Sequence, residues 1–120
     1  MTGKISTFKG DMFPVTLHLA TGFKDAADLN TTLHRKNILG NEFTLNKPKA
    51  DAATTYFLEA HPHAIIVIWD EHSLASLVHE AVHAGTYFCK VLGISTSHDE
   101  DEPLAYITGW VFRVCEKAMR

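Results

Sequence analysis

The pattern His-Glu-x-x-His lies within residues 77–84, a stretch that is predicted to be helical. Side chains four residues apart on a helix lie on the same face, one turn above the other. His79 and His83 can therefore offer ring nitrogens to one metal ion, and Glu80 lies beside them, within reach of a water on that ion. The pattern thus predicts a helix that carries two metal ligands and a general base.

The predicted helix is amphipathic. With successive residues about 100° apart around the helix axis, the apolar residues gather on one side. They are Leu74, Val78, Ala81, Val82, Phe88, Cys89 and Leu92. Its polar side carries another set: His72, Ser76, His79, His83, Tyr87 and Lys90. A polar face with this many rings and few charges indicates that something covers it. The alternative is a solvated face that carries histidines because the chain has 8 of them.

A catalytic zinc site needs a third protein ligand and leaves its fourth position to water. The candidates follow Gly93 in one acidic stretch: His98, Asp99, Glu100, Asp101 and Glu102. Spacing does not choose among them, because acidic residues also favour the first turn of a helix electrostatically.

A family resemblance selects one of these candidates. The motif residues are followed by a short loop, by Glu-x-x-Ala-Tyr and by an apolar helix, at Glu102, Ala105, Tyr106 and Gly109. Over residues 64–111 the chain resembles the small zinc metallopeptidase-like proteins of bacteriophage genomes. These are similar in plan to minimal gluzincins and to the ImmA/IrrE-type peptidase domain. The resemblance implies His79, His83 and Glu102 as zinc ligands and Glu80 as the catalytic acid and base.

The chain departs from this family pattern at Pro103, which directly follows the implied ligand. A residue before proline is pushed out of the helical region of backbone space. Glu102 would then flank the helix, with Pro103 at the first helical position. Glu100 therefore remains an alternative third ligand.

Length and composition predict one domain over residues 1–120, with a modest core built from 46% hydrophobic residues. The resemblance implies that this domain is a zincin-like metallopeptidase. The net charge is −3 and the pI is about 6.2, without a basic patch, so nucleic acid is not expected as a partner. We expect no signal peptide and no membrane span. Cys89 and Cys115 are expected to be buried reduced thiols. The predicted location is cytoplasmic, in the host cytoplasm if the chain is phage-encoded.

The predicted fold class is α+β: a small, mainly antiparallel sheet packed against the two-helix zincin-like unit. Period-two patterns predict strands over 4–8 and 13–19 and a hairpin of 54–59 with 64–69. Helices are predicted over 21–34, from 70–73 onward, and over 103–119. The apolar run at 65–68 indicates a strand covered on both faces. The long loop at 36–51 is a candidate lid, because loops of this length are commonly functional.

The predicted function is a zinc-dependent hydrolase that cleaves a peptide bond in a peptide or protein substrate. Zinc would lower the pKa of its bound water to about 7, and Glu80 would take a proton from that water and deliver it to the leaving amine. Tyr106, Tyr87 or His98 could assist the oxyanion, and the substrate could add to 64–69 if that strand has an open edge. The alternatives are a non-catalytic, zinc-stabilised interaction module that binds a host or phage protein, and a metal-free binding domain.

Overall fold

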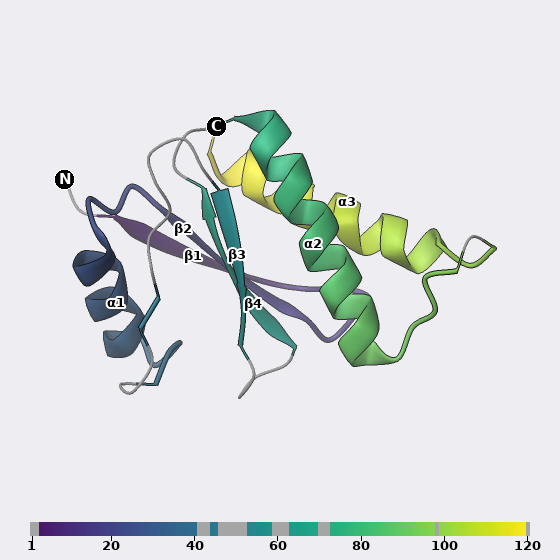
Figure 1. The fold of residues 1–120 in the computed structure, drawn as a ribbon, viewed down its shortest axis with the longest axis horizontal. Coiled ribbons are helices and arrows are strands. Elements are labelled where there is room, and N and C mark those ends of the chain that lie inside the picture. The colour runs from purple at the N-terminus through teal and green to yellow at the C-terminus, as the bar shows by residue number, and fades with distance from the viewer. Residues whose placement is uncertain are drawn as a thin grey trace.

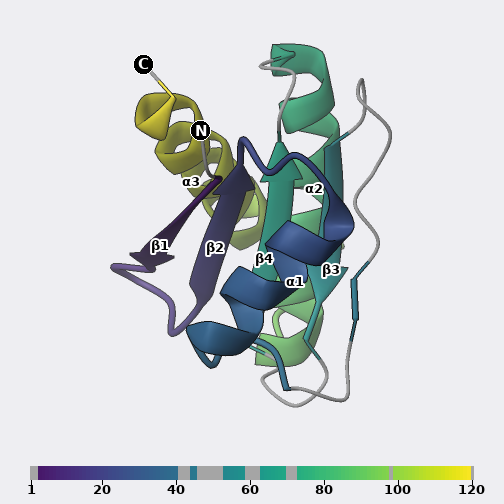
Figure 2. The same ribbon diagram turned by 90° about the vertical axis from the view of Figure 1, so that its left-hand side faces the viewer.

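A mixed sheet separates one helix from two others in the computed structural model, which describes residues 3–40, 44–45, 53–58, 63–69, 73–97 and 99–119. The elements follow in the order β1 (Lys4–Lys9), β2 (Thr16–Thr21), α1 (Ala26–Arg35), β3 (Ala53–Phe57), β4 (Ala64–Trp69), α2 (Leu74–Leu92) and α3 (Glu102–Ala118). Figures 1 and 2 show α1 on one face of the sheet, with α2 and α3 on the other. The predicted α+β class is confirmed.

The strand order is β1-β2-β4-β3, so β4 lies inside the sheet and β3 forms an edge. The pairs β1/β2 and β3/β4 are antiparallel, whereas the central pair β2/β4 is parallel. The prediction of a mainly antiparallel sheet is therefore corrected for the central strand pair, which is parallel. Parallel neighbours need a crossover connection, and the segment through α1 provides one by carrying the chain across the sheet before the β3/β4 hairpin forms.

Strand β4 is buried on both faces, as its apolar run predicts. Ile65, Val67 and Trp69 pack into a core with α2 and α3. The alternate residues Ile66 and Ile68 pack into a second core with α1. Alternation along the strand thus divides a continuous apolar run between two helical layers.

Local sequence defines both ends of α2. At its start, the Ser73 side chain caps the helix by accepting a hydrogen bond from the Ser76 backbone N–H at 3.2 Å. At the other end, Gly93 adopts a left-handed conformation with φ of 71°. The Ile94 N–H then reaches the Cys89 carbonyl at 2.8 Å, a bond characteristic of the Schellman motif.

The two cysteines lie in the core formed by the sheet, α2 and α3. Cys89 and Cys115 are free and fully buried. Burial raises the pKa of the Cys115 thiol to about 12, so this thiol stays protonated and unreactive at neutral pH. The described helices also include none that is both long and apolar enough to cross a bilayer.

Helices α2 and α3 approach closely at Gly85. A methyl group placed on this glycine would collide with the Thr108 hydroxyl oxygen and would lie 3.3 Å from the Leu104 side chain. The absence of a side chain at Gly85 is therefore what lets α3 lie against this side of α2. The contact fixes which flank of α2 the last helix occupies.

We predict that Gly85→Ala destabilises the protein by about 1–3 kcal/mol, the usual range for overpacking a close contact. Gly109→Ala is the matched control, because a methyl group there meets nothing within 4 Å. That change should be neutral or stabilising by up to about 1 kcal/mol, since alanine is the better helix former. Urea unfolding of both variants measures the difference, and equal stabilities would contradict the close approach.

Candidate functional site

His79 and His83 lie side by side on the exposed face of α2. Their Nε2 atoms are 3.1 Å apart, and their rings meet edge to face at an interplanar angle of 74°. In a tetrahedral zinc site with Zn–N bonds of about 2.0–2.1 Å, two ligand nitrogens stand about 3.3 Å apart. The pair therefore already has nearly the spacing that two ligands of one zinc ion require. Without a metal, one ring nitrogen donates its proton to the other.

Glu80 turns from the same face towards the sheet and is buried, with 8% of its surface exposed. Its Oε1 accepts a hydrogen bond from the Thr55 hydroxyl of β3 at 2.7 Å. Its other oxygen, Oε2, lies 3.9 Å from Nε2 of His79. One carboxylate oxygen is thus held by the sheet, and the other lies near the histidine pair.

A cleft runs between α2 and the edge strand β3. It is lined by Ala53, Thr54, Thr55, Phe57, Glu80 and His83. One helical turn beyond His83, Tyr87 stacks on Phe57 with ring centroids 4.1 Å apart and an interplanar angle of 6°. Glu80, His83 and Phe57 therefore line one cleft, with Tyr87 packed on Phe57.

Strand alternation decides which residues of β3 face α2. Thr55 and Phe57 pair with Val67 and Ile65 of β4, whose side chains belong to the core on the α2 side. Tyr56 pairs with Ile66, which packs on the α1 side. The predicted strand for substrate addition, 64–69, has no open edge because β2 and β3 flank it. The edge beside the site belongs to β3.

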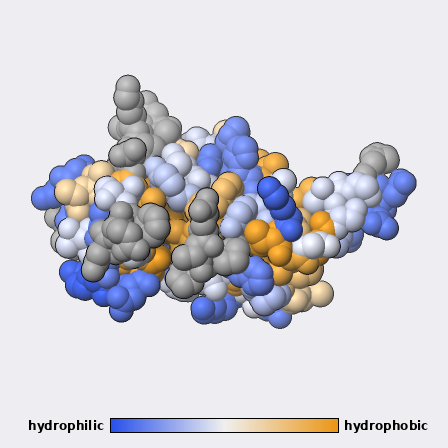
Figure 3. All heavy atoms as spheres, turned by 60° about the horizontal axis from the view of Figure 1, so that its bottom comes forward, coloured by the Kyte–Doolittle hydropathy of each residue, from blue (hydrophilic) through white to orange (hydrophobic). Residues whose placement is uncertain are grey.

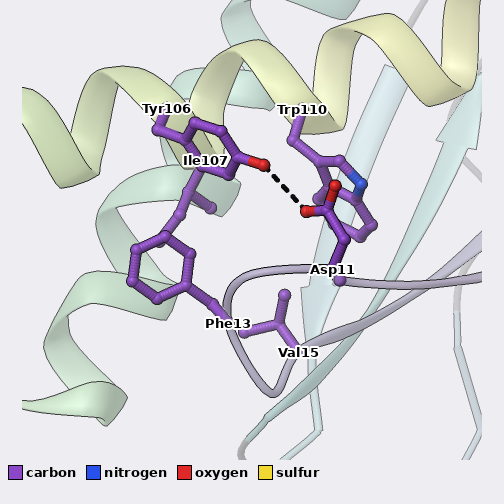
Figure 4. Close-up of a pocket in the computed structure, with 7 residues that line it drawn as sticks. Asp11, Phe13, Val15, Tyr106, Ile107 and Trp110 are labelled. Atoms are coloured by element: carbon purple, nitrogen blue, oxygen red, sulfur yellow. Dashed lines mark hydrogen bonds between the residues drawn. The ribbon is translucent and has the colours of Figure 1, made fainter.

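Tyr106 faces a different part of the molecule. Its hydroxyl donates a 2.8 Å hydrogen bond to Asp11, in the connection between β1 and β2 (Figure 4). Its ring lies against Phe13, with centroids 5.8 Å apart. This hydrogen bond lowers the pKa of Asp11 and raises the pKa of Tyr106. The structure therefore places Tyr106 at the β1–β2 connection and does not bring it to the histidine pair.

The position of Tyr106 also indicates the direction of Glu102. The two residues are four apart on α3, so they lie on the same face of that helix. Leu104 and Thr108 lie about half a turn away, and both contact Gly85 of α2. Glu102 is exposed, and by its spacing it falls on the face of α3 that carries Tyr106.

The three residues of the motif are brought together, and the predicted third ligand is not. Within the described ranges, no three His, Cys, Asp or Glu side chains are grouped so that they could hold a metal ion. Glu100, the alternative ligand, is exposed, as are Asp99 and Asp101. His98 lies outside the described residues. The site that the structure builds is thus His79, Glu80 and His83 on α2, with Thr55 from β3.

Comparisons of the chain with protein-family models, with curated proteins and with solved structures find no match.

Sequence reasoning missed Thr55 and Phe57 as parts of the site. The alternating pattern predicts a strand there, which places both residues on one face. That face could be assigned to α2 only with the order and register of the strands. Tyr87, a predicted candidate for oxyanion assistance, stacks on Phe57, which lines the cleft.

The geometry of α3 predicts how the substitution Glu102→Gln changes the affinity for zinc. We expect the zinc dissociation constant to change by less than about tenfold, which is smaller than the usual effect of residues that merely support a ligand. Zinc titration of this variant beside Glu100→Gln provides the measurement. The family resemblance predicts the opposite result. A loss of about a hundredfold, confined to Glu102→Gln, would mean that the first turn of α3 moves towards α2 when zinc binds.

Proposed function

We propose that this chain is a zinc-dependent hydrolase that cleaves peptide bonds, with His79 and His83 as zinc ligands and Glu80 as the general base. The observation that carries this proposal is the buried carboxylate. Glu80 is 8% exposed and is held at one oxygen by Thr55. Its second oxygen lies 3.9 Å from Nε2 of His79, and the two histidine nitrogens stand at ligand spacing. A buried carboxylate is costly unless it is paired, and a cation at the histidine pair would supply the charge.

The donor set suits zinc. Neutral imidazole nitrogens are common zinc ligands, and the exposed position of the pair leaves room for water and substrate. Zinc, when bound, supplies Lewis acidity that activates a water and polarises a carbonyl group. The family resemblance alone implies Glu102 as a third protein ligand, and the described residues do not bring Glu102 to the histidine pair.

Glu80 would transfer the protons of the reaction. Its Oε2 is free to accept a proton from the attacking water, because Thr55 engages Oε1. The same carboxyl group would then deliver the proton to the leaving amine nitrogen. This role needs an oxygen near the metal position that is not itself a ligand, which matches the 3.9 Å separation of Oε2 from the His79 ring nitrogen.

The position of β3 at an edge of the described sheet supports a peptide as the substrate. An extended peptide can add to an exposed strand edge through backbone hydrogen bonds. A peptide paired with β3 would run along the cleft between that strand and α2. Its carbonyl groups would then pass beside Glu80 and the histidine pair.

A second candidate function is the zinc-stabilised interaction module, in which the same helix binds another protein. Leu74, Val78 and Val82 form a stripe at four-residue spacing on α2, with 54%, 49% and 49% of their surfaces exposed. Hydrophobic surface also gathers in the right-hand part of Figure 3, the side on which α2 and α3 lie in Figure 1. Exposed apolar patches mark binding sites for other proteins. The two candidates differ in whether Glu80 is needed.

The first prediction from this proposal concerns zinc binding. Wild-type protein should bind one zinc per chain, and His83→Ala should remove the metal together with its stabilisation of the fold. His34→Ala, a histidine on α1, is the control and should retain zinc. Metal analysis and thermal unfolding with and without zinc provide the measurements. Equal zinc contents in wild type and His83→Ala would refute the site.

The second prediction separates catalysis from metal binding. Glu80→Gln should keep its zinc and its fold, and should lose peptide hydrolysis by at least the roughly hundredfold typical of a general base. Turnover of a peptide library is compared between the two proteins at matched zinc occupancy. Undiminished cleavage by the variant would exclude Glu80 as the base. Zinc binding without cleavage by either protein would favour the interaction module.

A further inference from the structure

We propose that Thr55 is the positioning residue for Glu80: its hydroxyl holds Oε1 so that Oε2 stays near the histidine pair. The catalytic consequence of this inference rests on the proposed function, whereas the positioning itself does not. Thr55 and Glu80 lie 25 residues apart in the chain and join β3 to α2 through one 2.7 Å hydrogen bond.

Thr55 is well placed to hold a side chain rigidly. Its β-branched side chain has restricted rotation about χ1. Its backbone pairs with Val67 of the buried central strand β4. The donor is thus fixed to the most buried strand of the sheet, so its position does not depend on the exposed end of α2.

Within the described part of the chain, Thr55 is the one hydrogen-bond donor to this carboxylate. On either side of it along the same strand face, Ala53 and Phe57 offer no side-chain donor. Removal of the hydroxyl would leave Oε1 buried without a partner. The side chain would then relieve that cost by rotating, which would also move Oε2 away from its place beside His79.

The expected effect on catalysis follows from this geometry. Proton transfer requires a base held within hydrogen-bond reach, and small misplacements cost large factors in rate. Loss of the Thr55 hydroxyl should therefore lower kcat by about tenfold or more. It should leave KM and zinc affinity unchanged, because the histidine pair keeps its own geometry.

The first experiment uses metal-free protein and needs no activity. A double-mutant cycle combines Thr55→Val with Glu80→Ala and follows thermal unfolding. Thr55→Val should lower Tm in the wild-type background and have little effect when Glu80 is already truncated. The same cycle with Thr7→Val, a threonine on the opposite edge strand that bonds His18, is the control and should give additive shifts. Additivity in the Thr55 cycle as well would overturn the proposal.

The second experiment measures zinc affinity and peptide turnover for Thr55→Val, Thr55→Ser and Thr7→Val. We expect lowered kcat in Thr55→Val alone, with Thr55→Ser restored because serine keeps the hydroxyl. Zinc dissociation constants should agree across all three. Full turnover in Thr55→Val, under conditions where Glu80→Gln is inactive, would overturn the positioning role. If wild type cleaves nothing, the proposed hydrolase fails, and the metal-free cycle still decides whether Thr55 holds Glu80.

Discussion

The burial of β4 on both faces determines where the candidate site forms. A strand whose successive residues all face an apolar layer is a central strand, covered by helices above and below and paired along both edges. β2 and β3 meet this need, so β3 becomes the edge of the sheet on one side. The β3 edge then lies beside α2, and Thr55 and Phe57 enter the groove. The burial of β4 on both faces thus determines which residues of β3 lie next to Glu80.

Three sides of helix α2 have different surroundings: the core, helix α3, and the side that carries the histidine pair. The helical period places different residues on each side. Leu77, Ala81 and Phe88 are buried in the core beneath the helix. Gly85 faces α3 on one flank. The histidine pair lies on another side: at 100° per residue, His79 and His83 are about 120° and 160° around the helix axis from Gly85. Because α3 occupies the Gly85 flank, its first turn does not meet the pair, and Glu102 stays apart from the residues it was expected to join.

Much of the fold could be predicted from local sequence, because the period of the apolar residues and the capping groups are local properties. The predicted strands, the predicted hairpin and all three helices form, and Ser73 and Gly93 bound α2 as their residue types indicate. The parallel pairing of β2 with β4 could not be predicted, since a strand's own pattern is the same for either direction. The role of Thr55 could not be predicted for a similar reason, because its contact with Glu80 depends on the register between β3 and β4.

The candidate site was predictable in part for a similar reason. Spacing of four on one helix correctly places His79 beside His83, and it also places Glu102 on the face of Tyr106. Spacing does not tell where that second face points. The direction follows from the close approach at Gly85 and from the Asp11–Tyr106 hydrogen bond, which joins residues 95 apart in the chain. Contacts of this range carry no local sequence signal.

The burial of Glu80 bears on whether the histidine pair has a chemical role or is incidental. A helix that serves only as a scaffold has no need of a carboxylate at this buried position, because burying a charge costs free energy unless the charge is paired and hydrogen-bonded. The chain instead places a carboxylate there and satisfies one oxygen with a threonine from a neighbouring strand. The exposed stripe of Leu74, Val78 and Val82 needs no such carboxylate to bind a partner. The cost of burying Glu80 therefore supports the proposed hydrolase over the proposed interaction module.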